Sequence, residues 1–190
     1  MGKLDGKIAL VTGASRGIGR ATAVRLAADG AYVVVNYFRG ADEKYPGAEQ
    51  EALRLVKQAG DGSLYEADVS DVPAVRRMIG DVVAQHGALD ILVNNAGICP
   101  MVELFDITEE LWDRVHALNL RAVFFCTQEG ARAMLDKKTK GRIICISSIS
   151  AEFGTGIAFV FSGGAQAVIA ARVFPDFWWY CHGQSYRSDR

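Results

Sequence analysis

The sequence has little cysteine, histidine or proline, and no excess of charge of either sign. Its 190 residues include 4 cysteines, 3 histidines and 4 prolines, and 21 basic against 22 acidic side chains leave a formal net charge of −1. Without a basic field the chain lacks the electrostatic footprint of a nucleic-acid-binding protein. The one long uncharged stretch, residues 153–171, is interrupted by glycines and polar residues, which argues against a membrane span. The expected partners are therefore small molecules, with no nucleic acid and no membrane among them.

The few cysteines and histidines do not form a disulfide scaffold or a metal site. No C-x-x-C spacing joins the cysteines at positions 99, 126, 145 and 181, and the histidines show no ligand pattern, so we assign no metal. The cysteines, of which Cys126 and Cys145 fall in apolar runs, are interpreted as buried thiols in a reducing compartment. The chain enters its first apolar run without a secretory signal, and we therefore expect a cytoplasmic location.

What the sequence does contain is an alternation of apolar, β-branched runs with helical patterns. Strands are expected at 7–11, at 31–36, in a run that ends at 66–69, in a run that starts at 91, and at 142–148. Helix-forming patterns lie between them, which is typical of a parallel sheet covered by helices on both faces. The predicted fold class is α/β, with a Rossmann-like doubly wound parallel sheet that is incomplete at its C-terminal edge.

A glycine-rich turn joins the first expected strand to the first expected helix. Helix N-termini offer unpaired N–H groups and a positive dipole end, and glycines allow a pyrophosphate to approach the backbone closely. The turn therefore predicts nucleotide binding, although a tight turn without a ligand is the plain alternative. The residues expected to contact the cofactor here are Gly13, Ser15, Arg16, Gly17, Ile18 and Gly19.

The spacing Gly13-x3-Gly17-x-Gly19 resembles the cofactor loop of the short-chain dehydrogenase/reductase family, ketoreductase type, whose members bind NAD or NADP. A second stretch, Asn94-Asn95-Ala96-Gly97, resembles the family motif that supports the central sheet and lines the cofactor cleft, so a structural role for the asparagines is as open as direct contact. The resemblance implies cofactor contacts at Asn95, Ala96 and Gly97. It also implies adenine contacts at Asp68 and Val69, although Asp68 is equally suited to cap the next helix.

The end of the second expected strand bears on the choice between the two coenzymes. It carries Asn36, Tyr37 and Arg39 but no carboxylate to accept from a ribose 2′-hydroxyl, as NAD-preferring sites have. Arg16 and Arg39 are suited to flank a 2′-phosphate, so NADP is favoured over NAD, unless both arginines are merely solvated. Asn36, Tyr37 and Arg39 are predicted cofactor residues, and the polar loop 41–47 is expected to be an exposed insertion.

The resemblance also implies catalytic residues, and here the sequence departs from the family. Asn119 lies beside an apolar helix face. It is either a buried amide bonded to the backbone or a match to the family's active-site asparagine. Ser148 matches the family's catalytic serine. The family's Tyr-x-x-x-Lys pair falls on Phe161 and Ala165, which offer neither a proton nor an ammonium group. Hydride transfer with a carbonyl or secondary alcohol substrate is thus implied, with doubtful activity.

The resemblance covers roughly residues 5–160 and fades after 171. We expect a dinucleotide-binding domain over 1–171 and an aberrant aromatic tail over 172–190, as if the family pattern were truncated or altered. The alternatives to an oxidoreductase are a non-catalytic NADP-binding or interaction protein and an inactive truncated product. Oligomerisation stays open, since the family's usual helix interface is altered here.

Overall fold

The computed structural model describes residues 2–148. In chain order, the elements are β1 (Ile8–Val11), α1 (Gly17–Ala28), β2 (Tyr32–Tyr37), the 3-10 turn η1 (Arg39–Ala41), α2 (Ala48–Ala59), β3 (Asp61–Glu66), α3 (Val72–His86), β4 (Ile91–Asn94), the 3-10 turn η2 (Leu104–Asp106), α4 (Glu109–His116), the π-helical turn η3 (Ala117–Ala122), α5 (Val123–Asp136) and β5 (Arg142–Cys145). The predictions for Phe161, Ala165, Cys181, the stretch 153–171 and the tail 172–190 lie outside the described residues.

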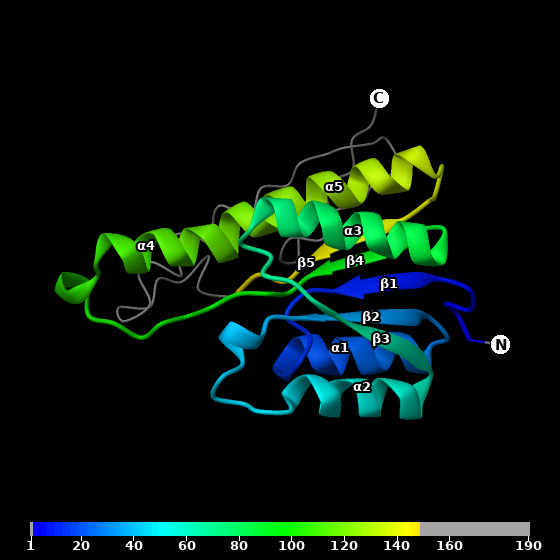
Figure 1. The fold of residues 1–190 in the computed structure, drawn as a ribbon, viewed down its shortest axis with the longest axis horizontal. Coiled ribbons are helices and arrows are strands. Elements are labelled where there is room, and N and C mark those ends of the chain that lie inside the picture. The colour runs from blue at the N-terminus through cyan, green and yellow to red at the C-terminus, as the bar shows by residue number, and fades with distance from the viewer. Residues whose placement is uncertain (1, 149–190) are drawn as a thin grey trace.

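The strands form one parallel sheet in the order β3-β2-β1-β4-β5 (Figure 1). The last residue of β1, Val11, pairs with Val35 of β2 on one side and with Val93 of β4 on the other. The strand order reverses direction at β1, which is where doubly wound sheets bind ligands beyond the carboxyl ends of their strands. The predicted Rossmann-like parallel sheet is confirmed, and within residues 2–148 β5 forms one edge.

Two apolar layers, one on each face, explain why the strands carry near-continuous hydrophobic runs. Helices α3 and α5 cover one face of the sheet, and α1 and α2 cover the other (Figure 1). Leu10 and Leu92 belong to the apolar cluster on the α3 and α5 face, and Val11 and Val93 belong to the cluster on the α1 and α2 face. Leu10, Val11 and Leu92 are 0% exposed. A strand covered on both faces needs apolar side chains at every position, because neither face meets water.

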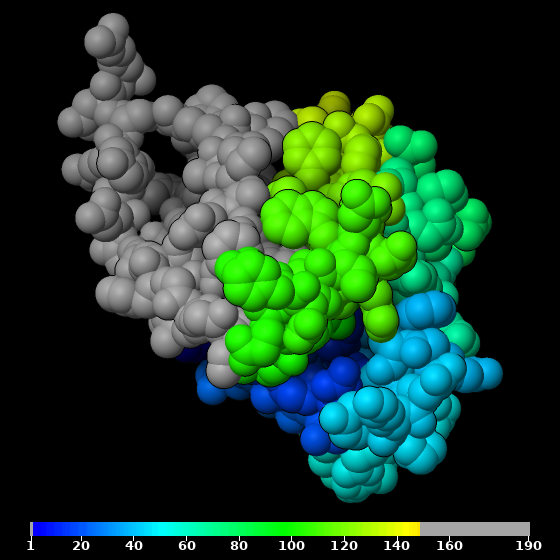
Figure 2. Space-filling view, turned by 90° about the vertical axis from the view of Figure 1, so that its left-hand side faces the viewer, coloured from blue at the N-terminus to red at the C-terminus, as the bar shows by residue number. Residues whose placement is uncertain are grey.

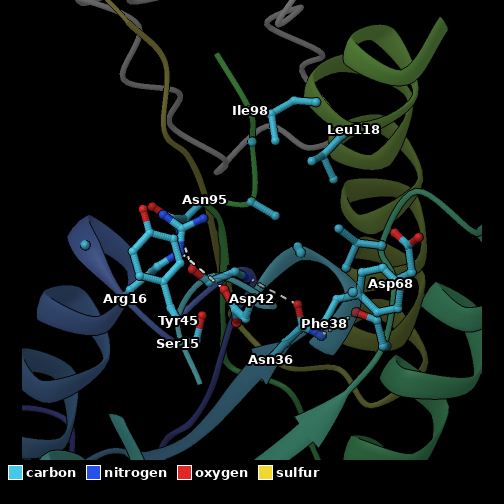
Figure 3. Close-up of a pocket in the computed structure, with 18 of the residues that line it drawn as sticks. Ser15, Arg16, Asn36, Phe38, Asp42, Tyr45, Asp68, Asn95, Ile98 and Leu118 are labelled. Carbon is cyan, nitrogen blue, oxygen red and sulfur yellow. Dashed lines mark hydrogen bonds and ion pairs between the residues drawn. The ribbon is translucent and has the colours of Figure 1, made fainter. Parts of the chain in front are cut away.

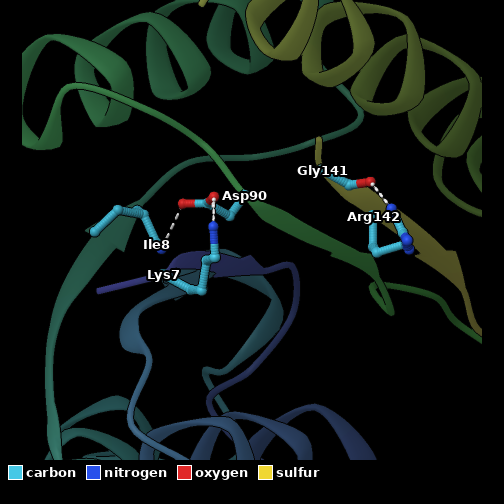
Figure 4. A network of polar contacts seen from close by, with 5 residues as sticks. All are labelled: Lys7, Ile8, Asp90, Gly141 and Arg142. Carbon is cyan, nitrogen blue, oxygen red and sulfur yellow. Dashed lines mark hydrogen bonds and ion pairs between the residues drawn. The ribbon is translucent and has the colours of Figure 1, made fainter. Parts of the chain in front are cut away.

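The amino ends of the strands are joined by a polar contact network around Asp90 (Figure 4). One carboxylate oxygen of Asp90 accepts from the Lys7 ammonium at 2.9 Å, and the other accepts from the Ile8 backbone N–H at 3.0 Å. The Asp90 carbonyl oxygen accepts from the Arg142 backbone N–H at 2.8 Å. This network ties β1, β4 and β5 together at the end of the sheet away from the glycine turn.

The helical stretch that carries Asn119 is divided into α4, the π-helical turn η3 and α5. A π turn widens the helix locally, so residues beyond it face a different direction. Asn119, within this turn, and Cys126, beyond it, are buried at 8% and 1% exposure, whereas Leu118 and Phe125 are half-buried. The thiol prediction is confirmed for Cys126 and wrong for Cys99, which is exposed. None of the helices in residues 2–148 is long and apolar enough to cross a bilayer.

Candidate functional site

A cavity of about 780 Å³ lies beyond the carboxyl ends of β1, β2 and β4 (Figure 3). Its walls come from segments far apart in the chain, which are the glycine turn, the end of β2 with the loop after it, residues 67–69, residues 95–98, and Arg114 and Leu118 of the α4 region. Figure 2 shows the side of the molecule where the strands end, with the green α4 and η3 segment above the blue glycine turn and the cyan loop after β2. The volume of the cavity is typical of a cofactor or small-molecule site.

The glycine turn presents backbone N–H groups to this cavity. Gly13 and Gly17 have positive φ angles of 60° and 57°, a conformation that residues with a Cβ rarely adopt. Helix α1 starts at Gly17, and the side chain of its N-cap, Arg16, makes no capping hydrogen bond. The first turn of α1 contains no acidic residue. Its free backbone N–H groups and the positive end of its dipole are therefore not compensated by a capping side chain or a carboxylate. These features fit the pyrophosphate of a dinucleotide.

Asn36 holds the turn in place rather than offering free polar atoms to a ligand. Its Oδ1 accepts from the Gly13 N–H at 3.2 Å, and its Nδ2 donates to the carbonyl oxygen of Ala67 at 3.0 Å. The residue lines the cavity but is 1% exposed. Its main role is thus to lock the glycine turn to the ends of β2 and β3.

The two arginines predicted to flank a 2′-phosphate lie in different places. Arg16 lines the cavity, whereas Arg39 and Tyr37 do not. The Tyr37 hydroxyl donates to Glu66 at 3.2 Å, and Arg39 pairs with the same carboxylate oxygen at 3.4 Å. Burial raises the pKa of the Tyr37 phenol. Of the two arginines, only Arg16 is placed to meet a ligand in the cavity.

The loop 41–47 is not simply the exposed insertion that its composition indicated. Asp42 is 7% exposed, and its Oδ1 accepts from Arg16 Nε at 3.2 Å. The Arg16 guanidinium also lies over the Tyr45 ring, 4.5 Å from its centroid (Figure 3). The expected exposure holds for the other residues of the loop and is wrong for Asp42 alone. A pattern of polar residues cannot show that one carboxylate folds back onto an arginine of another loop.

The Asn-Asn-Ala-Gly stretch supports the sheet, as one of the two interpretations predicted. Asn95 Nδ2 donates to the carbonyl oxygens of Thr12 at 2.9 Å and Gly13 at 3.1 Å, and Asn94 Nδ2 donates to the Thr127 hydroxyl at 3.0 Å. The Thr12 hydroxyl accepts the backbone N–H groups of both Asn95 and Ala96 at 3.0 Å. Asn95, Ala96 and Gly97 also line the cavity. Thr12, 2% exposed, is a positioning residue that the sequence reasoning missed, although it lies within the glycine stretch.

Asp68 and Val69 line the cavity as expected, but Asp68 does not cap the following helix. Its Oδ1 accepts from the backbone N–H of Ser70 at 2.9 Å and from the Ser70 hydroxyl at 2.7 Å. The N-cap of α3 is Asp71, which accepts from the Ala74 N–H at 3.2 Å. Two aspartates three positions apart both suit a cap, and only the backbone geometry selects between them.

The predicted catalytic residues lie at the margin of this site. Asn119 Oδ1 accepts from the Ile98 N–H at 2.9 Å, and its Nδ2 donates to the Ile98 carbonyl at 2.8 Å. This is the buried amide bonded to the backbone that one interpretation predicted, and it positions Ile98, which lines the cavity. Ser148 is half-buried just beyond the end of β5 and is not among the residues that line the described cavity.

The fold and the cavity define a nucleotide-binding domain of the Rossmann type. The sequence profile of the short-chain dehydrogenase family matches residues 7–171, and the chain belongs to that family. It is 42% identical over 168 residues to elsinochrome reductase 1 of Elsinoe fawcettii, which covers 87% of this chain and 60% of that protein. The chain therefore spans about three fifths of the length of this curated relative.

Solved structures of relatives hold either coenzyme. A short-chain dehydrogenase from Burkholderia cenocepacia in complex with NADP is 36% identical, with a TM-score of 0.77 over 87% of this chain and 65% of that one. A xylitol dehydrogenase bound to NAD⁺ is 28% identical, with a TM-score of 0.79 over 87% of this chain and 62% of that one. The family therefore binds NAD(P), and the choice between the two is a matter for residues of this chain.

Proposed function

We propose that the cavity binds NADP, and NAD less tightly. The single observation that carries the proposal is the uncapped start of α1 facing a cavity of about 780 Å³, with Gly13 and Gly17 at positive φ. The backbone N–H groups of this turn would hold the pyrophosphate, and Arg16 would meet a 2′-phosphate. When bound, NADPH would supply a hydride for reduction of a substrate, and NADP⁺ would accept one for its oxidation. Arg39, which is paired with Glu66 outside the cavity, is not needed for this role.

The reaction we propose is hydride transfer between the nicotinamide and a carbonyl or secondary alcohol of a small molecule, with little turnover. Ser148 would donate a hydrogen bond to the substrate oxygen, and Asn119 would hold the backbone at Ile98 in place. The positions of the family's general acid and its lysine are Phe161 and Ala165. Loss of general acid catalysis typically costs about 10²–10⁴-fold in rate.

The same two positions favour a second candidate function, a non-catalytic NADP-binding protein. Neither a phenyl ring nor a methyl group transfers a proton, so a chain that binds the coenzyme need not turn it over. The two candidates differ in one measurable quantity, the rate of NADPH oxidation in the presence of a ketone.

Coenzyme binding is tested by fluorescence titration of NADPH and NADH with the full chain and two matched variants. Arg16→Gln and Arg39→Gln each remove one positive charge, but only Arg16 lines the cavity. We expect Arg16→Gln to weaken NADPH binding about tenfold, the loss expected for one charge-assisted contact, and Arg39→Gln to leave it within twofold. Equal losses in both variants, or no binding of either coenzyme by the unmodified chain, would refute the proposal.

Turnover is tested by NADPH oxidation across a panel of ketones and keto-esters. The unmodified chain is expected to fall far below about 10 s⁻¹, a typical enzyme value. The double variant Phe161→Tyr with Ala165→Lys should raise the rate, because it supplies a proton donor and a cation that lowers the phenol pKa. A rate near the typical value for the unmodified chain would show that Phe161 and Ala165 do not occupy the roles assigned to them.

A further inference from the structure

The loop after β2 holds one buried carboxylate among exposed neighbours. From Phe38 to Gly47 every residue is exposed except Asp42, whose exposure is 7%. Its backbone is fixed on both sides, because its N–H donates to the Arg39 carbonyl at 3.0 Å and its carbonyl accepts from the Tyr45 N–H at 2.7 Å. Charged side chains are seldom buried without a partner. The placement of Asp42 therefore requires a cation beside it.

That cation is Arg16, the guanidinium that the proposed function assigns to the 2′-phosphate. Asp42 Oδ1 contacts Arg16 Nε at 3.2 Å, and the Arg16 Cζ lies 4.5 Å from the centroid of the Tyr45 ring. Within residues 2–148 the two terminal guanidinium nitrogens make no hydrogen bond, so they remain available to a ligand. Asp42 and Arg16 both line the cavity (Figure 3).

We propose that Asp42 is a specificity-determining residue of the coenzyme site, which opposes the 2′-phosphate of NADP and accepts from the 2′-hydroxyl of NAD. This inference rests on the proposed dinucleotide function. An anion that bonds Arg16 shares that guanidinium with the Asp42 carboxylate, and the buried position of Asp42 weakens screening of the repulsion by salt. A ribose hydroxyl meets no such repulsion and can donate to the carboxylate, which is the arrangement of NAD-preferring sites.

In this site the carboxylate comes from the loop after β2 rather than from the end of β2. The end of β2 carries an amide at Asn36, whose polar atoms bond the protein. Arg16 attracts the 2′-phosphate and Asp42 repels it, so the affinity for NADPH exceeds the affinity for NADH only modestly. Removal of the Asp42 charge should therefore increase the preference for NADPH over NADH.

The test is the ratio of the NADPH and NADH dissociation constants in Asp42→Asn and Glu43→Gln. Both variants remove one negative charge from the cavity wall, but Glu43 is exposed and makes no ion pair within residues 2–148. Asp42→Asn should bind NADPH about tenfold more tightly and NADH no more tightly than the unmodified chain, and Glu43→Gln should shift both by less than twofold. Adenosine 2′,5′-bisphosphate and adenosine 5′-monophosphate, titrated in competition, isolate the 2′-phosphate and should show the same change.

The outcomes separate this inference from the function on which it rests. If the unmodified chain binds neither coenzyme, both fail. If it binds them but Asp42→Asn leaves the ratio unchanged, moves both constants equally, or weakens NADPH, the specificity role alone is wrong and Asp42 only supports the loop. Asp42→Ser is a second neutral variant, to be used if thermal melting shows that Asp42→Asn does not fold, and it is expected to shift the ratio in the same direction.

Discussion

At the scale of single residues, most polar side chains of the site hydrogen-bond to the protein backbone and fix its position. Thr12, Asn36, Asn95 and Asn119 each bond backbone atoms of a different segment, and three of them are at most 8% exposed. Buried polar atoms that lose their partners cost about 1–3 kcal/mol each. The cavity is therefore shaped by backbone contacts whose loss would displace the glycine turn and the residues after β4.

Gly19 offers a direct test of this close packing. A Cβ at this position would lie 2.6 Å from the Gly13 carbonyl oxygen and 2.9 Å from the Ala14 Cα, and it would also meet the Asn95 amide. Gly19→Ala should destabilise the fold by about 1–3 kcal/mol, as overpacking does, and weaken NADPH binding because the glycine turn must move. Urea unfolding and fluorescence titration measure the two effects. Gly80→Ala, at an exposed position of α3 with no atom within 4 Å of the added carbon, is the matched control for the destabilising effect. Unchanged stability and affinity in Gly19→Ala would contradict the close approach.

Some residues of the site could be predicted from the sequence and others could not. Gly13, Gly17 and Gly19 were predictable because a strand-to-helix turn of this kind constrains φ and close approach locally, and both requirements are visible in residue type. Asp42 was not predictable, because its role depends on a contact with Arg16 across a loop of no regular period. For Arg39 the sequence predicted a contact that the structure does not show. Its position after β2 indicated a place in the coenzyme site, but Arg39 pairs with Glu66 and does not line the cavity.

At the scale of elements, the strands were easier to predict than the helices. Strands buried on both faces have apolar side chains at nearly every position, so β1 and β2 were placed to within one residue. The stretch from α4 to α5 follows a helical period, but the π turn η3 depends on tertiary packing that the spacing does not record. The burial of Asn119 and Cys126 was predicted from an amide beside an apolar face and a thiol in an apolar run, but the pattern could not identify Ile98 as the backbone partner of Asn119.

Helix α3 should become more stable when its interior glycine is replaced. Gly80 is exposed, and an added Cβ would meet nothing within 4 Å. Gly80→Ala should stabilise the fold by about 0.5–1 kcal/mol, because glycine loses more backbone entropy in a helix than alanine does. Gly130→Ala in α5 is the same chemical change in a tight place, since its Cβ would lie 2.6 Å from the buried Leu92 side chain, and it should destabilise. Urea midpoints of the two variants should move in opposite directions, and a shift of equal sign would contradict the packing described for α5.

The contact between β3 and α3 should make stability depend on pH in the alkaline range. The Tyr65 hydroxyl donates to Asp81 at 2.5 Å, and burial together with this bond raises the pKa of Tyr65 to about 12. An unfolded tyrosine has a pKa of about 10. The folded state therefore holds the proton more tightly, so the contribution to stability is complete below about pH 10 and is lost as the pH rises toward 12.

Tyr65→Phe removes this titration and should give a smaller loss of stability between about pH 10 and 12 than the unmodified chain shows. Urea unfolding at several pH values measures the difference in slope. Tyr45→Phe, which removes a hydroxyl from an exposed ring, is the control and should follow the unmodified chain. Parallel curves for Tyr65→Phe and the unmodified chain would mean that the Tyr65–Asp81 bond does not distinguish the folded from the unfolded state.

At the scale of the whole molecule, the described sheet is protected unequally on its two sides. The α3 and α5 face covers β1, β4 and β5, and Ile143 of β5 is 6% exposed there. The α1 and α2 layer covers β1, β2 and part of β4, whereas Ile144 and Ile146, which point to that side of β5, are 46% and 38% exposed. Exposed apolar side chains beside an edge strand are a surface suited to association.

The chain should therefore self-associate through the β5 edge. Within residues 2–148, β5 pairs only with β4, through Val93 and Ile144 among others. Ile144→Lys should lower the association measured by light scattering, because a charge on an edge strand opposes further strand pairing. Leu135→Lys, on α5 at 50% exposure, makes the same change away from the edge and should leave association as it is. A monodisperse monomer for the unmodified chain, or equal effects of the two variants, would show that β5 is not the surface through which copies meet.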